Sequence, residues 1–331
     1  MAKLVVGKNK KVGIPAVVRG SDQQKACKKF YVDEDGYLCK SRTIPDFSNV
    51  KYIEDDEVLY CGFRNSEEME GVLDFSALEY IDGHASCSEA FRGCKKITSV
   101  KFPSLWFVQV PQTASSFYNV GPCSDMFSGC TGLKSFDLSN LVHINGNEAC
   151  NGMFYECTRL KNANLEKLRI VIGDGAASSM FRNCKNLETV NLSSLEEVGG
   201  SNACSTMFDG CKKLKTVSFD NLQAVVGLNA FNNLFRYCEN LESVTFPKLR
   251  IINGSAAFCL MLGNCPKIKE LSFPSLAEVD THHTNTFESM LSSCTDVTVH
   301  FKSSLQSVIG GWSDVQTGFG GTRTTVLFDL D

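Results

Sequence analysis

The sequence lacks several features that would place it in a common functional class at once. None of its apolar runs approaches the roughly 18 residues that cross a bilayer, and its first residues contain no apolar core of a signal peptide. Neither sign of charge dominates, because 33 Lys and Arg residues stand against 37 Asp and Glu residues. We therefore expect no membrane insertion, no nucleic-acid partner and no export through a signal peptide.

Signatures of catalysis and of metal binding are also missing. The sequence has no Cys-x-x-Cys or His-x-x-x-His pair, and no P-loop, dinucleotide fingerprint or Gly-x-Ser-x-Gly motif in a strand-to-helix context. His282 and His283 lie in a turn rich in Thr and Asn, without a nearby thiol pair. Asp33–Gly36 lacks the later ligands of a calcium loop and is interpreted as a hairpin turn. We expect no enzyme activity, no cofactor and no metal site.

What the sequence has in abundance is a repeat marked by cysteine. Eight of its 16 cysteines recur at a nearly constant interval, which is 36 at the first step, 27 at the next five and 29 at the last: Cys94, Cys130, Cys157, Cys184, Cys211, Cys238, Cys265 and Cys294. One cysteine per repeat is not half of a local pair, so we interpret these thiols as buried, reduced core residues. A metal or redox array of stacked thiols is the alternative.

Other positions keep the same period and predict the structure of one coil. Apolar side chains recur at positions +3, +6, +8, +11 and +14 relative to each cysteine, and those at +6 and +8 predict one short strand per coil. The segment before each cysteine, such as Cys204–Cys211, has the spacing of a short amphipathic helix. Gly or Asn before the cysteine and a recurrent Gly after the strand predict tight turns. Since no coil can bury its apolar face alone, we expect the strands to stack as a parallel ladder.

These patterns predict an α/β repeat solenoid, a right-handed coil of the leucine-rich-repeat kind with a parallel β ladder and short helices. About ten coils occupy residues 45–309, counting two degenerate copies without cysteine. Residues 1–44 are predicted to form a β-hairpin cap or attachment module, and residues 310–331 a C-terminal cap.

Both ends carry their own signals. In the N-terminal module, Leu4–Val6 is expected to pair with Val12–Val18, and Phe30–Val32 with Tyr37–Cys39. Near the C-terminus, the glycine-rich segment 310–321 is interpreted as part of the cap, with a contact loop as the alternative.

A family resemblance becomes visible at this point. The run Met126-Phe127-Ser-Gly-Cys130-Thr-Gly-Leu133-Lys-Ser-Phe136-Asp-Leu138 resembles the BspA-like class of leucine-rich repeats, and the match spans nearly eight coils. The resemblance implies a bacterial or protozoan surface protein that binds host proteins or other cells. The coils here are a few residues longer than usual in that class.

Two surfaces are candidate partner contacts. The outward strand positions are small, polar and nearly uncharged, and they suit a glycan or an extended peptide; solvated polar residues are the alternative. They include Asn164, Asn191, Ser218 and Thr245.

The second candidate surface is the one break in the period, where the interval of 36 leaves nine extra residues near 109–122. Insertions in solenoids emerge as loops, often on the binding face. Aromatic residues concentrate here, and aromatics are frequent interface anchors: Trp106, Phe107, Phe117 and Tyr118. Packing of this loop onto the side of the rod is the alternative.

The sequence therefore predicts a non-catalytic recognition or adhesion solenoid that binds a protein or glycan surface. A phage virion or tail fibre is one setting, in which residues 1–44 would dock to the particle or support a homo-oligomer. The alternative is an intracellular protein–protein interaction scaffold, which agrees with reduced thiols. Virion and cytoplasm both stay open as locations.

Overall fold

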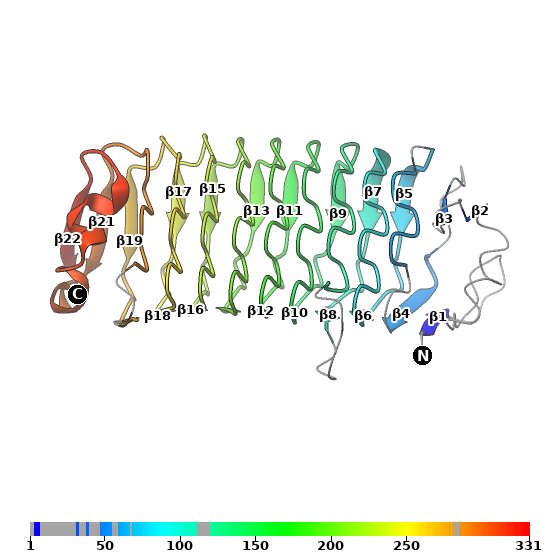
Figure 1. The fold of residues 1–331 in the computed structure, drawn as a ribbon, viewed down its shortest axis with the longest axis horizontal. Helices are drawn as coiled ribbons and strands as arrows, with labels where there is room; N and C mark the ends of the chain where they lie inside the picture. Colours follow the sequence, from blue (N-terminus) through cyan, green and yellow to red (C-terminus); the bar gives the residue numbers. More distant parts are fainter. Residues whose placement is uncertain are drawn as a thin grey trace.

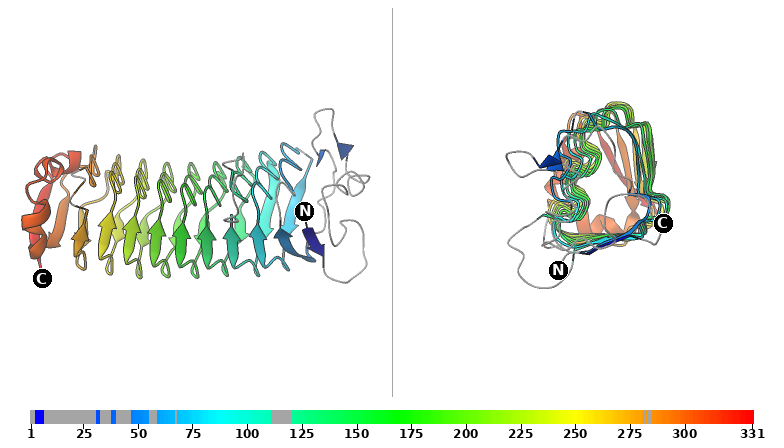
Figure 2. Two further views of the ribbon diagram at one scale, coloured as in Figure 1. Left: turned by 60° about the horizontal axis from the view of Figure 1, so that its bottom comes forward. Right: turned by 90° about the vertical axis from the view of Figure 1, so that its right-hand side faces the viewer.

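The protein forms a rod of about ten stacked coils, with β1 and β22 at opposite ends (Figure 1). The end view in Figure 2 shows the coils superposed as one closed outline around an interior. The computed structural model describes residues 3–6, 31–32, 38–39, 47–54, 59–66, 68–110, 120–280, 282 and 285–331. The predicted solenoid with a parallel ladder is confirmed.

One side of the rod is a ten-stranded sheet, here called the long sheet. All neighbouring strands in it pair in parallel except the first pair, which is antiparallel. In spatial order its strands are β1 (Lys3–Val6), β4 (Val50–Glu54), β6 (Tyr80–Asp82), β8 (Phe107–Gln109), β10 (His143–Asn145), β12 (Ile170–Ile172), β14 (Glu197–Gly199), β16 (Ala224–Val226), β18 (Ile251–Asn253) and β20 (Glu278–Val279).

A second row of strands follows another side of the rod and is divided into four short sheets (Figure 1). These are the strands that the sequence predicted around positions +6 and +8 relative to each cysteine. The short sheets are β5 (Glu70–Asp74), β7 (Lys96–Lys101) and β9 (Ser135–Asp137); β11 (Asn162–Asn164) and β13 (Thr189–Asn191); β15 (Thr216–Ser218) and β17 (Ser243–Thr245); and β19 (Glu270–Phe273), β21 (Thr298–Lys302) and β22 (Thr325–Leu330).

The coil thus contains two strands, and the prediction of one strand per coil was wrong. The missed strand has only three residues in most coils, as in Glu197–Gly199, with a single inward side chain, Val198. Three residues are too few to show an alternating pattern by themselves.

The predicted short helix before each cysteine was also wrong. In the segment 173–184, residues Gly175, Ser179 and Asn183 have φ between 54° and 65°, a left-handed residue at every fourth position. An α-helix tolerates no such residue in its interior. The segment is a run of tight turns, and we call it and its counterparts the turn segments.

Hydrogen bonding explains why turns replace the helix. Alternate N–H groups close turns to the carbonyl three residues earlier, as from Met180 to Ala177. The others donate to the next coil, as from Ala177 to Ala203 at 2.7 Å and from Phe181 to Met207 at 2.9 Å. A helix would bond most of these N–H groups within its own segment, whereas the turns leave every second one free to bond to the next coil.

The core consists of stacked columns of identical side chains. Buried Phe rings from successive turn segments lie nearly parallel, with centroids 5.2–5.7 Å apart: Phe63, Phe91, Phe127, Phe154, Phe181, Phe208 and Phe235. Leu, Val and Ile side chains from the long sheet and from the short sheets fill the remainder of the interior.

The two ends differ from the coils. β1 pairs antiparallel with β4, while residues 12–18, its predicted partner, lie outside the described residues. The short strands β2 (Tyr31–Val32) and β3 (Leu38–Cys39) pair antiparallel, and the predicted turn Asp33–Gly36 between them lies outside the described residues.

The last coil carries the helices of the described chain: η3 (Ser303–Leu305), α2 (Gln306–Ile309), α3 (Ser313–Gln316) and η4 (Gly318–Gly320). Within this segment Trp312 and Phe319 are buried against the hydrophobic core. Such burial is what a cap at the end of a solenoid requires.

Candidate functional site

Two of the predicted contact residues, Trp106 and Phe107, lie on the outer side of the long sheet. Trp106 immediately precedes β8, and 46% of its surface is exposed. The partly exposed ring of Phe107 stacks on the indole, with centroids 5.2 Å apart and an interplanar angle of 22°. The other two aromatic residues of the insertion, Phe117 and Tyr118, lie outside the described residues.

Phe107 belongs to a row of aromatic side chains that crosses four strands of the long sheet. The strand register pairs Tyr52 with Tyr80, Tyr80 with Phe107, and Phe107 with His143. The rings of Tyr52 and Tyr80 lie 4.8 Å apart, and those of Phe107 and His143 lie 5.8 Å apart, edge to face. We call Tyr52, Tyr80, Trp106, Phe107 and His143 the aromatic strip.

A row of hydrogen-bonding side chains runs beside the aromatic strip. Asp82, Gln109 and Asn145 are in register with one another, two residues further along the same strands. Gln109 Nε2 donates to Asp82 Oδ2 at 3.0 Å. The other carboxylate oxygen, Asp82 Oδ1, is buried and has no hydrogen-bond partner among the described residues. We call these three residues the polar row.

The charges around the aromatic strip nearly cancel. The carboxylate of Glu79 lies 3.5 Å from Lys51 Nζ and accepts a hydrogen bond from the Tyr52 hydroxyl at 3.3 Å. Burial and the neighbouring Arg169 lower the pKa of His143, so its ring is neutral at pH 7. Arg169 itself is paired with Glu196 at 2.9 Å.

Sequence reasoning named only two of the five residues of the aromatic strip, Trp106 and Phe107. Tyr52, Tyr80 and His143 were missed, although a signal exists: Phe107 and His143 hold the same place in their coils, counted from the repeat cysteines Cys94 and Cys130. The two tyrosines precede the first repeat cysteine, but each stands directly before the last apolar residue of a degenerate copy, Ile53 or Ile81, as Phe107 stands before Val108.

The other predicted surface lies on the short sheets, away from the aromatic strip. Asn164, Asn191 and Thr245 are exposed and Ser218 is half-buried. Its polar groups bond along the ladder: the hydroxyls of Ser218 and Thr245 lie 2.7 Å apart, and Thr189 Oγ1 donates to Asn162 Oδ1 at 2.6 Å. The predicted contact residues therefore already form hydrogen bonds with side chains of neighbouring strands, and fewer of their polar groups are left for a ligand.

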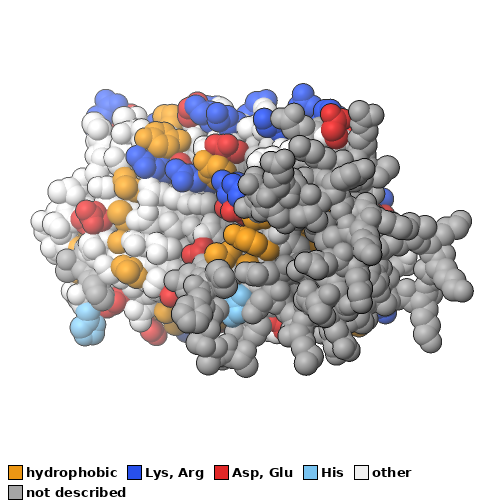
Figure 3. All heavy atoms as spheres, turned by 45° about the vertical axis from the view of Figure 1, so that its right-hand side comes forward, with side chains coloured by type: hydrophobic (Ala, Val, Ile, Leu, Met, Phe, Trp, Pro, Cys, Tyr) orange, Lys and Arg blue, Asp and Glu red, His pale blue; other side chains and the backbone are white. Residues whose placement is uncertain are grey.

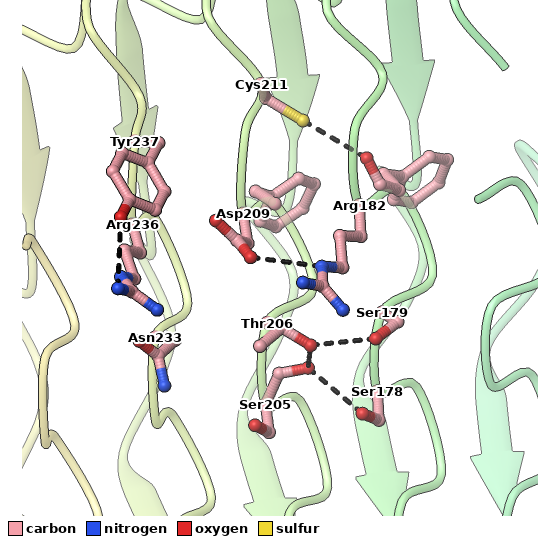
Figure 4. A network of polar contacts seen from close by, with 12 residues as sticks. Ser178, Ser179, Arg182, Ser205, Thr206, Asp209, Cys211, Asn233, Arg236 and Tyr237 are labelled. Carbon is pink, nitrogen blue, oxygen red and sulfur yellow. Dashed lines mark hydrogen bonds and ion pairs between the residues drawn. The ribbon is translucent and has the colours of Figure 1, made fainter. Parts of the chain in front are cut away.

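A third polar surface follows the turn segments (Figure 4). Arg182 Nε donates to the buried carboxylate of Asp209 at 3.0 Å, and the hydroxyls of Ser179 and Thr206 lie 2.8 Å apart. Burial raises the pKa of Asp209, while Arg182 and Arg236 act in the opposite direction. These contacts join one coil to the next, and so we interpret the network as structural.

The repeat cysteines all lie in the core. Each thiol donates to the main-chain carbonyl of the residue, usually Phe, that closes the preceding turn segment, as from Cys184 to Phe154 at 3.1 Å and from Cys211 to Phe181 at 3.2 Å. Burial raises the pKa of Cys184 to about 12. Fourteen cysteines of the described chain are buried free thiols, and no group of three or more potential metal ligands occurs within the described ranges.

Figure 3 shows one face of the rod, with Lys and Arg side chains along its upper edge and acidic and apolar side chains scattered in small groups. In the part of the chain that the structure describes, no helix has the length and apolar character needed to span a membrane.

Comparison with protein families gives one match by sequence. The model of a family described as BspA type leucine rich repeat region matches in six copies, over residues 87–196, 115–234 and 205–309. No curated protein matches the chain.

Among solved structures, the rod is similar to three bacterial leucine-rich repeat proteins. One from Bacteroides ovatus is 18% identical with a TM-score of 0.46, over 100% of this chain and 77% of that one. One from T. pallidum is 18% identical with a TM-score of 0.39, over 72% of this chain and 86% of that one. A leucine-rich cell surface protein of Faecalibacterium prausnitzii is 14% identical with a TM-score of 0.33, over 89% and 92% of the two chains.

Proposed function

The chain belongs to the BspA-type leucine-rich repeat family, and from this premise we propose that it is a recognition protein that binds a protein or glycan on a cell surface through its long sheet. Leucine-rich repeat proteins generally mediate recognition and are typically non-catalytic. Adhesion is the role in which a rigid rod with a repeated outer surface is most useful, because it can display many contacts at once.

The aromatic strip is the observation that carries this proposal. Exposed aromatic side chains are enriched where proteins bind partners, because they offer a large contact area at a small cost in conformational entropy. Trp106 is the most exposed member, and Phe107 fixes one face of its ring. The exposed polar residues of the short sheets, Asn164, Asn191 and Thr245, form a second candidate contact surface.

The test is binding of the fluorescently labelled full chain to intact bacterial and animal cells, measured by flow cytometry. We expect saturable binding to at least one cell type and a loss of affinity of about tenfold or more in Trp106→Ala. The matched control is Tyr237→Ala, since Tyr237 is also exposed (41%) but lies on a turn segment, where it contacts Arg236.

Circular dichroism of both variants should match the unsubstituted chain, because both side chains lie outside the core. Absence of binding to every cell type, or equal effects of the two substitutions, would count against the proposal.

An intracellular interaction scaffold is the second candidate. The buried free thiols favour it, because thiols of cytosolic proteins stay reduced. The mass of the chain in solution, measured by light scattering under reducing conditions, distinguishes an extracellular recognition protein from an intracellular scaffold. A closed homo-oligomer supports display on a fibre or virion, for which residues 1–44 are the proposed docking module, and a monomer supports the scaffold.

A further inference from the structure

The main chain of the long sheet offers no free edge at the aromatic strip. β6, β8 and β10 are each hydrogen-bonded to a neighbouring strand on both sides. A peptide therefore cannot join the sheet there as an added strand, which is a common way for extended peptides to gain affinity. A ligand at this site must be recognised by side chains alone.

The side chains form an apolar column and a polar column on one face. Members of the aromatic strip and the polar row stand two residues apart on each strand, as Phe107 and Gln109 do, which corresponds to about 7 Å. Successive coils repeat this arrangement at intervals of about 4.8 Å along the rod. The surface is thus flat, rigid and periodic, with ring carbons on one side and hydrogen-bonding groups on the other.

The ring of Trp106 is held ready for contact. Its stacking on Phe107 covers one face of the indole, while 46% of the surface of Trp106 is still exposed. The electron-rich face of an indole attracts C–H groups that carry partial positive charge. A ligand with flat C–H faces would stack there without reordering the side chain.

The polar row supplies both donors and acceptors. The hydrogen bond from Gln109 to Asp82 fixes the orientation of the amide, and Asn145 adds a second amide one coil further along. Asp82 Oδ1 is buried, so the polar groups that the described part of the chain leaves for a ligand are the half-buried amides of Gln109 and Asn145. Such groups suit the hydroxyls of a ligand.

We propose that the aromatic strip and the polar row bind a neutral oligosaccharide. A pyranose ring has apolar C–H faces and hydroxyl groups on its rim, which complement the two columns. Lys51 compensates Glu79, and the carboxylate of Asp82 bonds to the neutral amide of Gln109, so the site carries no excess of positive charge that would attract a polyanion. This inference rests on the recognition function proposed above and names its ligand class.

The experiment uses the full chain and hexasaccharides of β-1,4-linked glucose, xylose, mannose and N-acetylglucosamine and of α-1,4-linked glucose, with hexagalacturonate as the acidic comparison. The chain has only two tryptophans, of which Trp106 is 46% exposed and Trp312 is 8% exposed. In the Trp312→Phe variant, tryptophan fluorescence therefore reports on the strip alone.

We expect at least one neutral hexasaccharide to shift the emission of Trp312→Phe to shorter wavelength, because stacking removes water from the indole. Calorimetric titration should show a loss of affinity of about tenfold or more in Trp106→Ala. Gln109→Ala should lose less, and the control Tyr237→Ala should bind as the unsubstituted chain does.

Three results would overturn the inference: binding of hexagalacturonate alone, sugar binding that Trp106→Ala leaves intact, or no sugar binding at all. The flow-cytometry assay with intact cells then shows whether the proposed recognition function still holds. If cells still bind through Trp106, and protease treatment of the cells but not periodate oxidation abolishes binding, the partner is a protein and only the glycan inference fails. If cells do not bind either, both proposals fail.

Discussion

The repeat cysteine combines two roles at the scale of the residue. Its sulfur is buried in the core, and its S–H group donates to a main-chain carbonyl in the preceding coil, as from Cys184 to Phe154. The raised pKa keeps the thiol protonated at neutral pH, so the donor persists. A side chain that only filled space would leave this bond between coils unmade.

We expect Cys184→Ala to lower the free energy of unfolding by about 1–3 kcal/mol, because it removes buried sulfur and the hydrogen bond to Phe154. Urea denaturation followed by circular dichroism measures the change. Cys259→Ala is the matched control, since Cys259 lies at the edge of the core (9% exposed) outside the column. Equal losses in the two variants would show that the column of thiols adds nothing beyond burial.

The burial of these cysteines could be predicted from sequence, but their hydrogen bonds could not. Recurrence once per repeat, without local pairs, is enough to indicate one thiol per coil in the core. The acceptor is a main-chain carbonyl, which carries no sequence signal, and it lies 30 residues away from Cys184.

At the scale of the element, the glycine that follows most long-sheet strands sets how closely coils approach. Gly200 has φ +113°, and a Cβ placed there would lie 2.5 Å from the carbonyl oxygen of Gly173 in the preceding coil. Both the backbone conformation and the contact exclude a larger residue. The preceding residue, Gly199, has ordinary φ, and its Cβ would lie 3.6 Å from Ile172 Cγ1.

Gly200→Ala should therefore destabilise the rod by roughly 2 kcal/mol or more, because the alanine is strained and its Cβ pushes two coils apart. Gly199→Ala, one residue away on β14, should change the unfolding free energy by less than about 1 kcal/mol. Thermal unfolding of the two variants under identical conditions makes the comparison. Similar melting temperatures would mean that the coil spacing tolerates a methyl group.

The turn segments show why sequence patterns misjudged this element. Apolar residues at Ala177, Met180, Phe181 and Cys184 have the spacing of one helix face, yet a turn that repeats every four residues buries the same set. The left-handed positions are occupied by residues as different as Gly, Ser, Thr, Asn, Glu and Leu. Only the position before the repeat cysteine shows a local preference, for Gly or Asn, as at Asn183 and Gly210; at the other positions contacts between coils impose the conformation.

At the scale of the whole molecule, the site is a product of register. Trp106 and Phe107 were proposed as contacts because the broken period drew attention to the insertion. Tyr80 and His143 each lie a whole coil away from Phe107 in the sequence. The repeat places all three at the same position of their coils, and strand pairing makes them neighbours. The register of the repeat thus holds through the candidate site at Phe107, and the insertion interrupts it only afterwards.

Contacts between nearest-neighbour coils also imply that the rod tolerates the loss of a whole coil. Deleting residues 211–237 removes one full repeat, joins Gly210 to Cys238 and keeps every column in register. In the deletion variant Arg250 takes the place of Gln223 beside Glu196. The two side chains can form an ion pair like that between Arg169 and Glu196.

We expect this deletion variant to unfold cooperatively and to lose about a tenth of its stability, one coil's share in a nearest-neighbour array. Small-angle scattering should show a rod shorter by about 5 Å. The shorter deletion 211–234 shifts all later columns by three positions and should leave the C-terminal coils unfolded, with weaker circular dichroism. Equal stability of the two deletions would show that in-register stacking is not what holds the rod together, because only the first preserves it.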